Sequence, residues 1–215
     1  MALLFLIRHG VTDQTGKRLY GRAPDVHLSD RGREQAETLA ARFEGVRLQA
    51  VYASPLERCL ETAAPLAAAQ RLETRESDGL LEVDYGSWTG RPLANLARTK
   101  LWPVVQQLPS QARFPGGESL SEAGSRMTAE LLRIATAHPR GRVAIVTHGD
   151  PIRLAISDLA GAHIDQFQRI VIEPGSVSVV GLRPGALPRI FLVNDTGDLS
   201  AYVAQRQRPG TNLRG

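Results

Sequence analysis

Two histidine-glycine pairs and two arginines stand where phosphate chemistry could be carried out. The first apolar run of the chain is followed directly by Arg8, His9 and Gly10. Two later apolar runs are followed by Arg58 and by His148. A neutral imidazole is a nucleophile that can carry a phosphoryl group. A guanidinium group holds phosphate oxygens with two parallel hydrogen bonds. These residue types therefore predict phosphoryl transfer.

Phosphoryl transfer also needs a proton for the leaving oxygen. Glu82 is the best candidate, because a carboxyl group in a partly closed crevice can hold a raised pKa. The alternative interpretations are a surface carboxylate for Glu82, a solvated helix residue for Arg58 and a structural role for either histidine. Two His-Gly pairs after two strands favour the catalytic interpretation. His27, His138 and His163 lack such a setting and are expected to be structural.

Short apolar runs alternate with helical stretches along the chain, which is typical of an α/β fold around a largely parallel sheet. The expected strands lie at residues 3–7, 50–53, 143–146, 169–172, 176–182 and 189–193. Short connections between the last three predict antiparallel neighbours among them. Ligands bind at the carboxyl ends of parallel strands, so the three polar clusters are expected to meet in one crevice.

Capping residues predict where helices begin. Ser29 precedes a helical stripe of apolar residues. Residues 54–57, Ser-Pro-Leu-Glu, have the pattern of an N-cap, a first-turn proline and a capping box, which predicts a helix from residue 54 with a kink or break near Pro65. Ser119 and Glu122 predict a second capping box at the start of a long helix.

The chain is expected to form one domain. Its 215 residues can bury a core without the help of disulfides or metal ions, and no linker divides them. We expect this domain to span residues 1–204. Residues 72–117, rich in glycine and proline, are expected to form a lid-like excursion with one or two short helices. Residues 205–215 form a polar, basic run and are expected to be a flexible tail.

Composition excludes several classes of protein. The chain is 42% hydrophobic and 22% charged, which excludes wholesale disorder. Its one cysteine cannot form an internal disulfide, and no zinc-finger spacing occurs, so a cytoplasmic setting is expected. The apolar N-terminal run is too short to cross a bilayer, so no membrane association is expected. The arginines that carry the net charge of +4 are scattered among acidic residues, so nucleic-acid binding is not expected.

Taken together, the motifs resemble the histidine phosphatase superfamily, in its phosphoglycerate-mutase-like branch. The resemblance covers nearly the whole chain and rests on the order and spacing of many segments. The matching segments are Arg8-His9-Gly10 with Thr12, Leu28-Ser29-Asp30-Arg31-Gly32 with Gln35-Ala36, Ser54-Pro55 with Arg58 and Thr62, Glu82 with Gly86, Trp88 and Gly90, Pro115-Gly116-Gly117-Glu118-Ser119 with Arg126, and Thr147-His148-Gly149.

The resemblance implies a three-layer α/β/α sandwich with a mostly parallel central sheet and an enzyme that acts on small phosphorylated metabolites. His9 would accept the phosphoryl group. Arg8, Arg58 and His148 would form the phosphate pocket. Glu82 would be the proton donor that later activates water. The resemblance implies neither a metal nor an organic cofactor, and it implies a homodimer, since family members are often dimers.

The loop after the first strand holds secondary candidates for binding the substrate or its phosphate, namely Thr15, Gly21 and Arg22. Two of its positions depart from the family pattern, because Val11 stands where many relatives have Glu or Gln, and Thr15 stands where many have Asn. The Thr15 hydroxyl can still bind phosphate. Asp198 stands where a family loop often carries His, so no catalytic role is assigned to it.

Phosphatases and mutases of this family both begin with a phosphohistidine. A mutase must exclude water and hold a bisphosphorylated intermediate, whereas a phosphatase admits water. Cofactor-dependent mutases have a larger insertion after the acid, and here the stretch from Glu82 to Pro115 is short, so we expect a metal-independent phosphomonoesterase. The alternatives are a cofactor-dependent phosphoglycerate mutase and a non-catalytic protein that holds a phosphorylated ligand. The latter usually lacks the nucleophile or the acid, and this chain has both.

Overall fold

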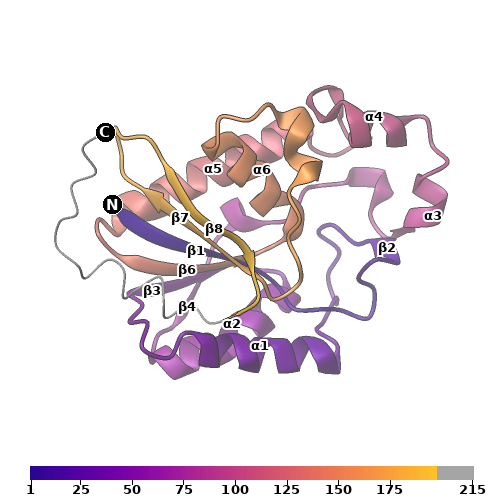
Figure 1. Cartoon of the computed structure of the whole chain (residues 1–215). Helices are drawn as coiled ribbons and strands as arrows, with labels where there is room; N and C mark the ends of the chain where they lie inside the picture. Colours follow the sequence, from indigo (N-terminus) through magenta and orange to yellow (C-terminus); the bar gives the residue numbers. More distant parts are fainter. Residues whose placement is uncertain (198–215) are drawn as a thin grey trace.

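Five of the six expected apolar runs become strands of one six-stranded sheet (Figure 1). In the computed structural model, which describes residues 1–197, the strand order is β4-β3-β6-β1-β7-β8. The strands are β1 (Ala2–Arg8), β3 (Ala50–Ala53), β4 (Thr74–Glu76), β6 (Arg142–Thr147), β7 (Val177–Leu182) and β8 (Arg189–Asp195). The first four strands of this order are parallel to one another. At the other end of the sheet, β7 pairs antiparallel with β1, and β8 pairs antiparallel with β7. This confirms the predicted arrangement. Asp198 and residues 205–215 lie outside the described residues.

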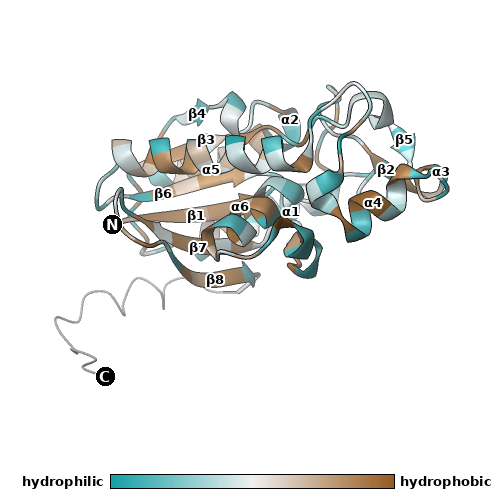
Figure 2. Cartoon of the chain, turned by 90° about the horizontal axis from the view of Figure 1, so that it is seen from above, coloured by the Kyte–Doolittle hydropathy of each residue, from teal (hydrophilic) through white to brown (hydrophobic). Residues whose placement is uncertain are grey.

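Helices cover both faces of the sheet because its strands are apolar on both faces. Along β1, which Figure 2 shows in the colour of apolar residues, Leu4 and Leu6 pack on one side and Phe5 and Ile7 on the other. This is the two-residue period of a strand buried on both faces. The first side is covered by α5 (Leu120–Ala137) and α6 (Gly149–Leu159), the second by α1 (Asp30–Arg42) and α2 (Glu57–Gln70). The three-layer sandwich is thereby confirmed.

Two predicted helix starts are confirmed. The Ser29 side chain caps α1 by accepting a hydrogen bond from the Gly32 amide. Ser119 and Glu122 form the capping box of α5, as predicted. None of the helices described within residues 1–197 has both the length and the apolar character that a bilayer span requires.

The helix predicted to start at Ser54 is wrong in its first turn. α2 begins at Glu57 after Leu56, which makes no side-chain cap. The Ser54 hydroxyl instead lies 2.9 Å from the Nε2 atom of His148, so a tertiary contact replaces the local cap. The predicted break at Pro65 is also wrong, because α2 continues to Gln70. Its apolar face packs on the sheet on both sides of the proline and holds the helix there.

The strand predicted at residues 169–172 does not form. A 3-10 helix, η4 (Ile164–Arg169), is followed by irregular chain that leads to β7. Ile172 is buried against the sheet, and Nη1 of Arg8 donates to its carbonyl oxygen at 2.6 Å. A guanidinium therefore satisfies the backbone where a neighbouring strand was expected.

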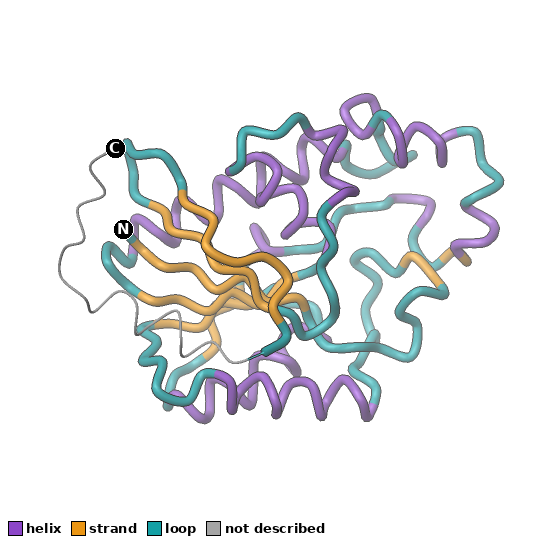
Figure 3. The backbone as a smooth tube through the Cα atoms, viewed as in Figure 1, coloured by secondary structure: helices purple, strands orange, loops and turns teal. Residues whose placement is uncertain are grey.

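Residues 86–114 form a small lobe beyond the carboxyl ends of the parallel strands (Figure 3). Thr74–Glu76, within the stretch predicted as an excursion, belong to the main sheet as β4. The lobe contains η2 (Gly86–Trp88), β5 (Arg91–Pro92), α3 (Leu93–Leu96), α4 (Leu101–Gln107) and η3 (Pro109–Gln111). β5 pairs with β2 (Arg18–Leu19), and Trp88 and Phe114 share an apolar cluster with Leu154 of α6, so the lobe and the domain are continuous. A further 3-10 helix, η1 (Asp78–Leu80), precedes the lobe.

Two glycines let the loop after β1 lie against the start of α1. A Cβ atom on Gly32 would overlap the Val11 carbonyl oxygen, and one on Gly10 would lie 2.7 Å from the Gly32 oxygen, closer than such atoms approach in proteins. Only glycine permits this backbone contact. Because Gly10 directly follows His9, the contact also determines where the His9 backbone lies.

We expect Gly32→Ala and Gly124→Ala to have opposite effects on stability, although both glycines lie in helices. The Gly32 substitution overlaps backbone and should lower the free energy of unfolding by roughly 1–3 kcal/mol. The Gly124 substitution meets only Leu154 at an ordinary 3.6 Å and should raise it by up to about 1 kcal/mol. Urea denaturation measures both changes. Equal effects would contradict the predicted overlap at Gly32.

Candidate active site

The carboxyl ends of three neighbouring strands bring the predicted residues together. β1 and β3 both pair with β6 in parallel, and His9, Ser54 and His148 each directly follow one of these strands. The ring centroids of the two histidines are 5.3 Å apart. His9 lines a cavity of about 310 Å³ between the strand ends and the lobe, together with Arg8, Arg58 and Glu82.

His9 is held as a neutral base. The ring is 7% exposed, and its Nδ1 atom donates to the Gly10 carbonyl oxygen at 2.7 Å, because a carbonyl can only accept. Burial, together with the charges of Arg58 and Arg8, holds the pKa of His9 well below its usual range. The lone pair of a neutral ring bonded in this way is on Nε2, which makes that atom the nucleophile.

His148 lies behind Arg58 rather than in the wall of the cavity. Nη2 of Arg58 donates to its Nδ1 atom at 3.2 Å, so the proton is on Nε2, which donates to the Ser54 hydroxyl at 2.9 Å. Burial and the charge of Arg58 hold the pKa of His148 well below its usual range. The sequence predicted His148 in the phosphate pocket, and in the structure it contacts the pocket through the Arg58 guanidinium.

Arg8 and Arg58 each leave a buried donor unused. Arg8 donates through Nη1 to the Ile172 carbonyl, and Arg58 donates through Nη2 to the Gly21 carbonyl at 2.7 Å. Within residues 1–197, buried Nε of Arg8 and buried Nη1 of Arg58 have no hydrogen-bond partner. Buried donors are rarely left unsatisfied, and two on cationic groups beside one cavity are suited to an anion.

Glu82 is a carboxyl group that can hold a proton near neutral pH. Its side chain is 13% exposed, and one oxygen accepts from the Val83 amide at 2.9 Å. Burial and the nearby charge of Asp150 raise the pKa of Glu82 to about 7. Its other oxygen lies 3.9 Å from Nδ1 of His148, and Glu82 lines the same cavity as His9.

A network of arginines holds the backbone of the Glu82 segment. Arg126 donates to the carbonyl oxygens of Gly79, Leu81 and Glu82 at 3.0, 2.9 and 3.3 Å. Nε of Arg22 donates to the Glu82 carbonyl at 2.8 Å. The Glu118 carboxylate pairs with both arginines, at 2.9 and 3.0 Å. Arg22, predicted to border the substrate, therefore contacts the Glu82 backbone instead of lining the cavity.

The other two secondary candidates do line the cavity. The Thr15 hydroxyl, in the first loop, accepts a hydrogen bond from the Thr12 amide at 3.0 Å. Gly21 has a φ of +54°, and its carbonyl holds Arg58. His27 and His138 lie outside the cavity and pair with Glu61 and Tyr52, while His163 caps η4.

Sequence reasoning missed the polar group around Asp150. Tyr85 donates its hydroxyl to Asp150 at 2.8 Å, Arg153 pairs with the same carboxylate at 3.1 Å, and all three line the cavity. Asp150 lies in the first turn of α6, so the strand-end rule that selected His148 could also have selected it. Within residues 1–197, no three His, Cys, Asp or Glu side chains are grouped closely enough to hold a metal ion.

Comparison with known proteins decides the family. Residues 4–196 match the model of the histidine phosphatase superfamily, branch 1. The chain belongs to this superfamily. Phosphoserine phosphatase 1 of Hydrogenobacter thermophilus is 30% identical over 185 residues, 84% of this chain and 86% of that protein.

Two solved structures support the family fold of this histidine phosphatase. YhfR of Bacillus stearothermophilus has a TM-score of 0.86 at 24% identity and covers 92% of this chain and 99% of its own. Phosphoserine phosphatase of Entamoeba histolytica, solved in complex with 3-phosphoglyceric acid, has a TM-score of 0.80 at 25% identity. It covers 93% of this chain and 100% of its own. The mixed α/β fold with a mostly parallel sheet is shared with both.

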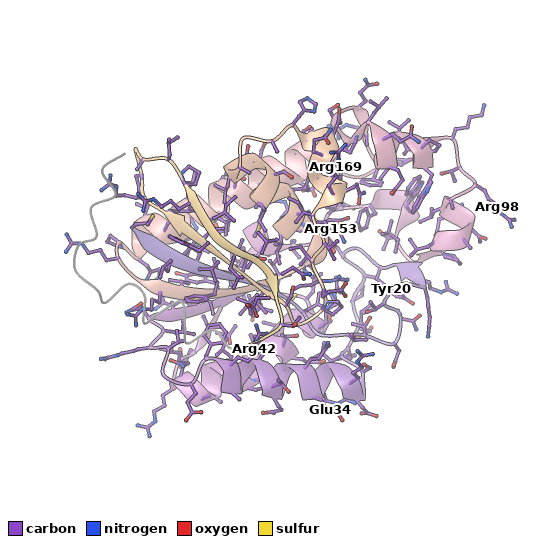
Figure 4. The ribbon with its side chains drawn as sticks, viewed as in Figure 1. Tyr20, Glu34, Arg42, Arg98, Arg153 and Arg169 are labelled. Atoms are coloured by element: carbon purple, nitrogen blue, oxygen red, sulfur yellow. The ribbon has the colours of Figure 1, made fainter. Side chains whose placement is uncertain are left out.

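We expect inorganic phosphate to bind this histidine phosphatase through the unused donors of Arg8 and Arg58. Arg58→Met should weaken phosphate binding roughly 10-fold to 100-fold, because a hydrogen bond to a charged group contributes about 1.5–3 kcal/mol. Isothermal titration calorimetry measures the change. Arg98→Met, an exposed arginine of the lobe labelled in Figure 4, is the matched control. Unchanged affinity in Arg58→Met would rule out this anion site.

Proposed function

We propose that this enzyme is a metal-independent phosphomonoesterase that hydrolyses small phosphate esters through a phosphohistidine at His9. The observation that carries the proposal is the pair of unused, buried guanidinium donors beside a neutral imidazole. The donors are suited to the phosphate oxygens, and the imidazole supplies the nucleophile. Together they favour attack on a bound phosphate over simple binding of it.

In the first step, Nε2 of His9 attacks phosphorus and the ester P–O bond breaks. Arg8 and Arg58 offset the charge that spreads over the three transferred oxygens. Glu82, protonated because of its raised pKa, gives its proton to the leaving alkoxide. The products of this step are the free alcohol, the phosphohistidine and the Glu82 carboxylate.

In the second step, the Glu82 carboxylate takes a proton from water as the water oxygen attacks phosphorus. The P–N bond breaks, phosphate leaves, and neutral His9 and protonated Glu82 are restored. One group can act first as acid and then as base because its pKa lies near the working pH. Thr15 and Gly21 would complete the phosphate site from the first loop, and Arg22 would hold the Glu82 backbone.

The mutase alternative requires the same phosphohistidine together with a site for a second phosphate. Within residues 1–197, the cations that line the cavity beyond Arg8 and Arg58 are Arg153, which pairs with Asp150, and Arg18, which is exposed. This supply is small for a bisphosphorylated intermediate, so hydrolysis is favoured. Conversion of 3- to 2-phosphoglycerate with 2,3-bisphosphoglycerate, with little phosphate release, would overturn this choice.

The remaining expectations belong to the same proposal. The substrate would be a small phosphorylated metabolite, and the enzyme would need no organic cofactor. A homodimer and a cytoplasmic location are predictions from the family resemblance and from cysteine usage, and light scattering tests the first. Retention of every predicted catalytic residue disfavours the non-catalytic alternative.

We expect His9→Ala to lower phosphate release from 4-nitrophenyl phosphate by at least about a thousandfold, because the nucleophile is lost. The assay contains EDTA, so wild-type activity there would support metal independence. The control is His163→Ala, whose exposed side chain lies at the start of η4. Residual activity within tenfold of wild type in His9→Ala would exclude His9 as the nucleophile.

We expect Glu82→Gln to slow alkyl esters roughly 10²-fold to 10⁴-fold and 4-nitrophenyl phosphate much less, because a good leaving group needs little protonation. Exposed Glu76→Gln is the matched control. Equal losses on the two ester classes would count against Glu82 as the acid.

The pH profile gives a second test of Glu82. Burial raises the pKa of Glu82 to about 7, so the fraction that can donate a proton falls as the pH rises above 7. For an alkyl ester, kcat/KM should therefore fall about tenfold per pH unit on that alkaline limb. The limb should be absent in Glu82→Gln, and its persistence there would assign it to another group.

A further inference from the structure

The cavity continues well beyond the residues proposed to hold phosphate. Its far side comes from the first loop, the lobe and η4 and is mostly apolar, with Gln106 and Gln168 as polar lining residues from the lobe and η4. We call the apolar part of this side the distal wall. It consists of Leu19, Leu93, Trp102, Val105, Phe114 and Phe167. These side chains belong to the apolar cluster that joins the lobe to the domain, or pack against it.

The distal wall presents apolar surface to the cavity. Leu19, Leu93 and Trp102 are only partly buried, although each packs on the apolar cluster. The Trp102 ring stacks on Trp88, which also lines the cavity, with 6.3 Å between centroids. Burial of such surface by a ligand group is favourable, and pockets of this kind typically bind apolar parts of small molecules.

Within residues 1–197, the charged side chains that line the cavity lie outside the distal wall. Arg153 pairs with Asp150 through Nη1 at 3.1 Å, while its buried Nε has no hydrogen-bond partner within residues 1–197, and both residues line the cavity (Arg153 is labelled in Figure 4). Arg22 is paired with Glu118. Arg18 lies at the rim, exposed, and donates to the Gly90 carbonyl at 2.9 Å, so solvent screens its charge. A carboxylate placed against the distal wall itself would lose hydration and would meet only apolar side chains there.

Resting on the proposed function, we infer that the preferred substrates are phosphate monoesters whose alcohol carries an uncharged, apolar group that packs on the distal wall. The phosphate would bind at Arg8 and Arg58, and the apolar group would extend toward Leu93 and Trp102. Esters that carry a carboxylate or an ammonium group, such as phosphoserine and 3-phosphoglycerate, are then poorer substrates. The cavity volume of about 310 Å³ is at the small end of ligand sites, so the group is compact.

A series of unbranched alkyl phosphates from methyl to hexyl tests this inference. Their leaving alcohols are alike in acidity, so the demand on Glu82 stays nearly constant while apolar area grows. We expect kcat/KM to rise up to about fourfold for each methylene that becomes buried. Hexyl phosphate should exceed phosphoserine and 3-phosphoglycerate by at least about tenfold. A flat series, or a carboxylated ester hydrolysed faster than hexyl phosphate, would overturn the inference.

Variants of the distal wall connect the chain-length effect to its residues. Trp102→Ala and Leu93→Asn should each reduce the hexyl-to-methyl ratio of kcat/KM severalfold. The matched control is Leu108→Asn, because Leu108 is 45% exposed on the same lobe and does not line the cavity. Leu93 is the milder site if Trp102→Ala lowers the unfolding temperature. A ratio that stays at the wild-type value in both variants would exclude the distal wall as the binding surface.

Failure of the inference and failure of the proposed function give different results. If 4-nitrophenyl phosphate and every alkyl phosphate release no phosphate, the enzyme is not the proposed phosphomonoesterase. If all esters are hydrolysed in a manner that depends on His9 but without a chain-length effect, only the apolar preference is wrong.

Discussion

The burial of two guanidinium groups beside two imidazole rings is the constraint on which the rest of the structure depends. Each charge favours neutral histidines nearby, and burial acts in the same direction. A buried guanidinium also needs acceptors for its N–H groups. Gly21 and Ile172 supply carbonyl oxygens for this purpose, and each lies on irregular chain close to a strand end. The loops around the site are therefore shaped by the demand for acceptors as much as by local propensity.

The position of Glu82 depends on a second electrostatic arrangement. Its carboxyl group is beside Asp150, which favours the protonated form, while its backbone is held by Arg22 and Arg126. The Glu118 carboxylate pairs with both of these arginines. The segment is thus fixed through its carbonyl oxygens, and the side chain is left to exchange protons. The position of Glu82 and its pKa are therefore controlled by different neighbours, namely the arginines that hold its backbone and the Asp150 charge beside its carboxyl group.

The lobe serves the fold and the site with the same side chains. Its apolar cluster joins it to α5 and α6, as the contacts of Phe114 and Leu154 show. The outer edge of that cluster is the distal wall of the cavity. Because the wall is part of the core of the lobe, a change of ligand preference through these residues also changes how the lobe packs.

The sequence by itself determined five of the six strands of the main sheet, two of the helix starts and the meeting of Arg8, His9 and Arg58 at one edge of the sheet. These features can be read from short segments of sequence, because they follow from apolar periodicity, from capping residues and from the rule that ligands bind at the carboxyl ends of parallel strands. The tertiary structure alone decided that Ser54 bonds to His148 instead of capping α2, and that Arg22 holds a backbone carbonyl instead of facing the cavity. It also decided that residues 169–172 pack without pairing. In each case a polar group had two possible partners, and the partner distant in sequence was selected because it satisfies a buried charge or ring nitrogen that no local bond could reach.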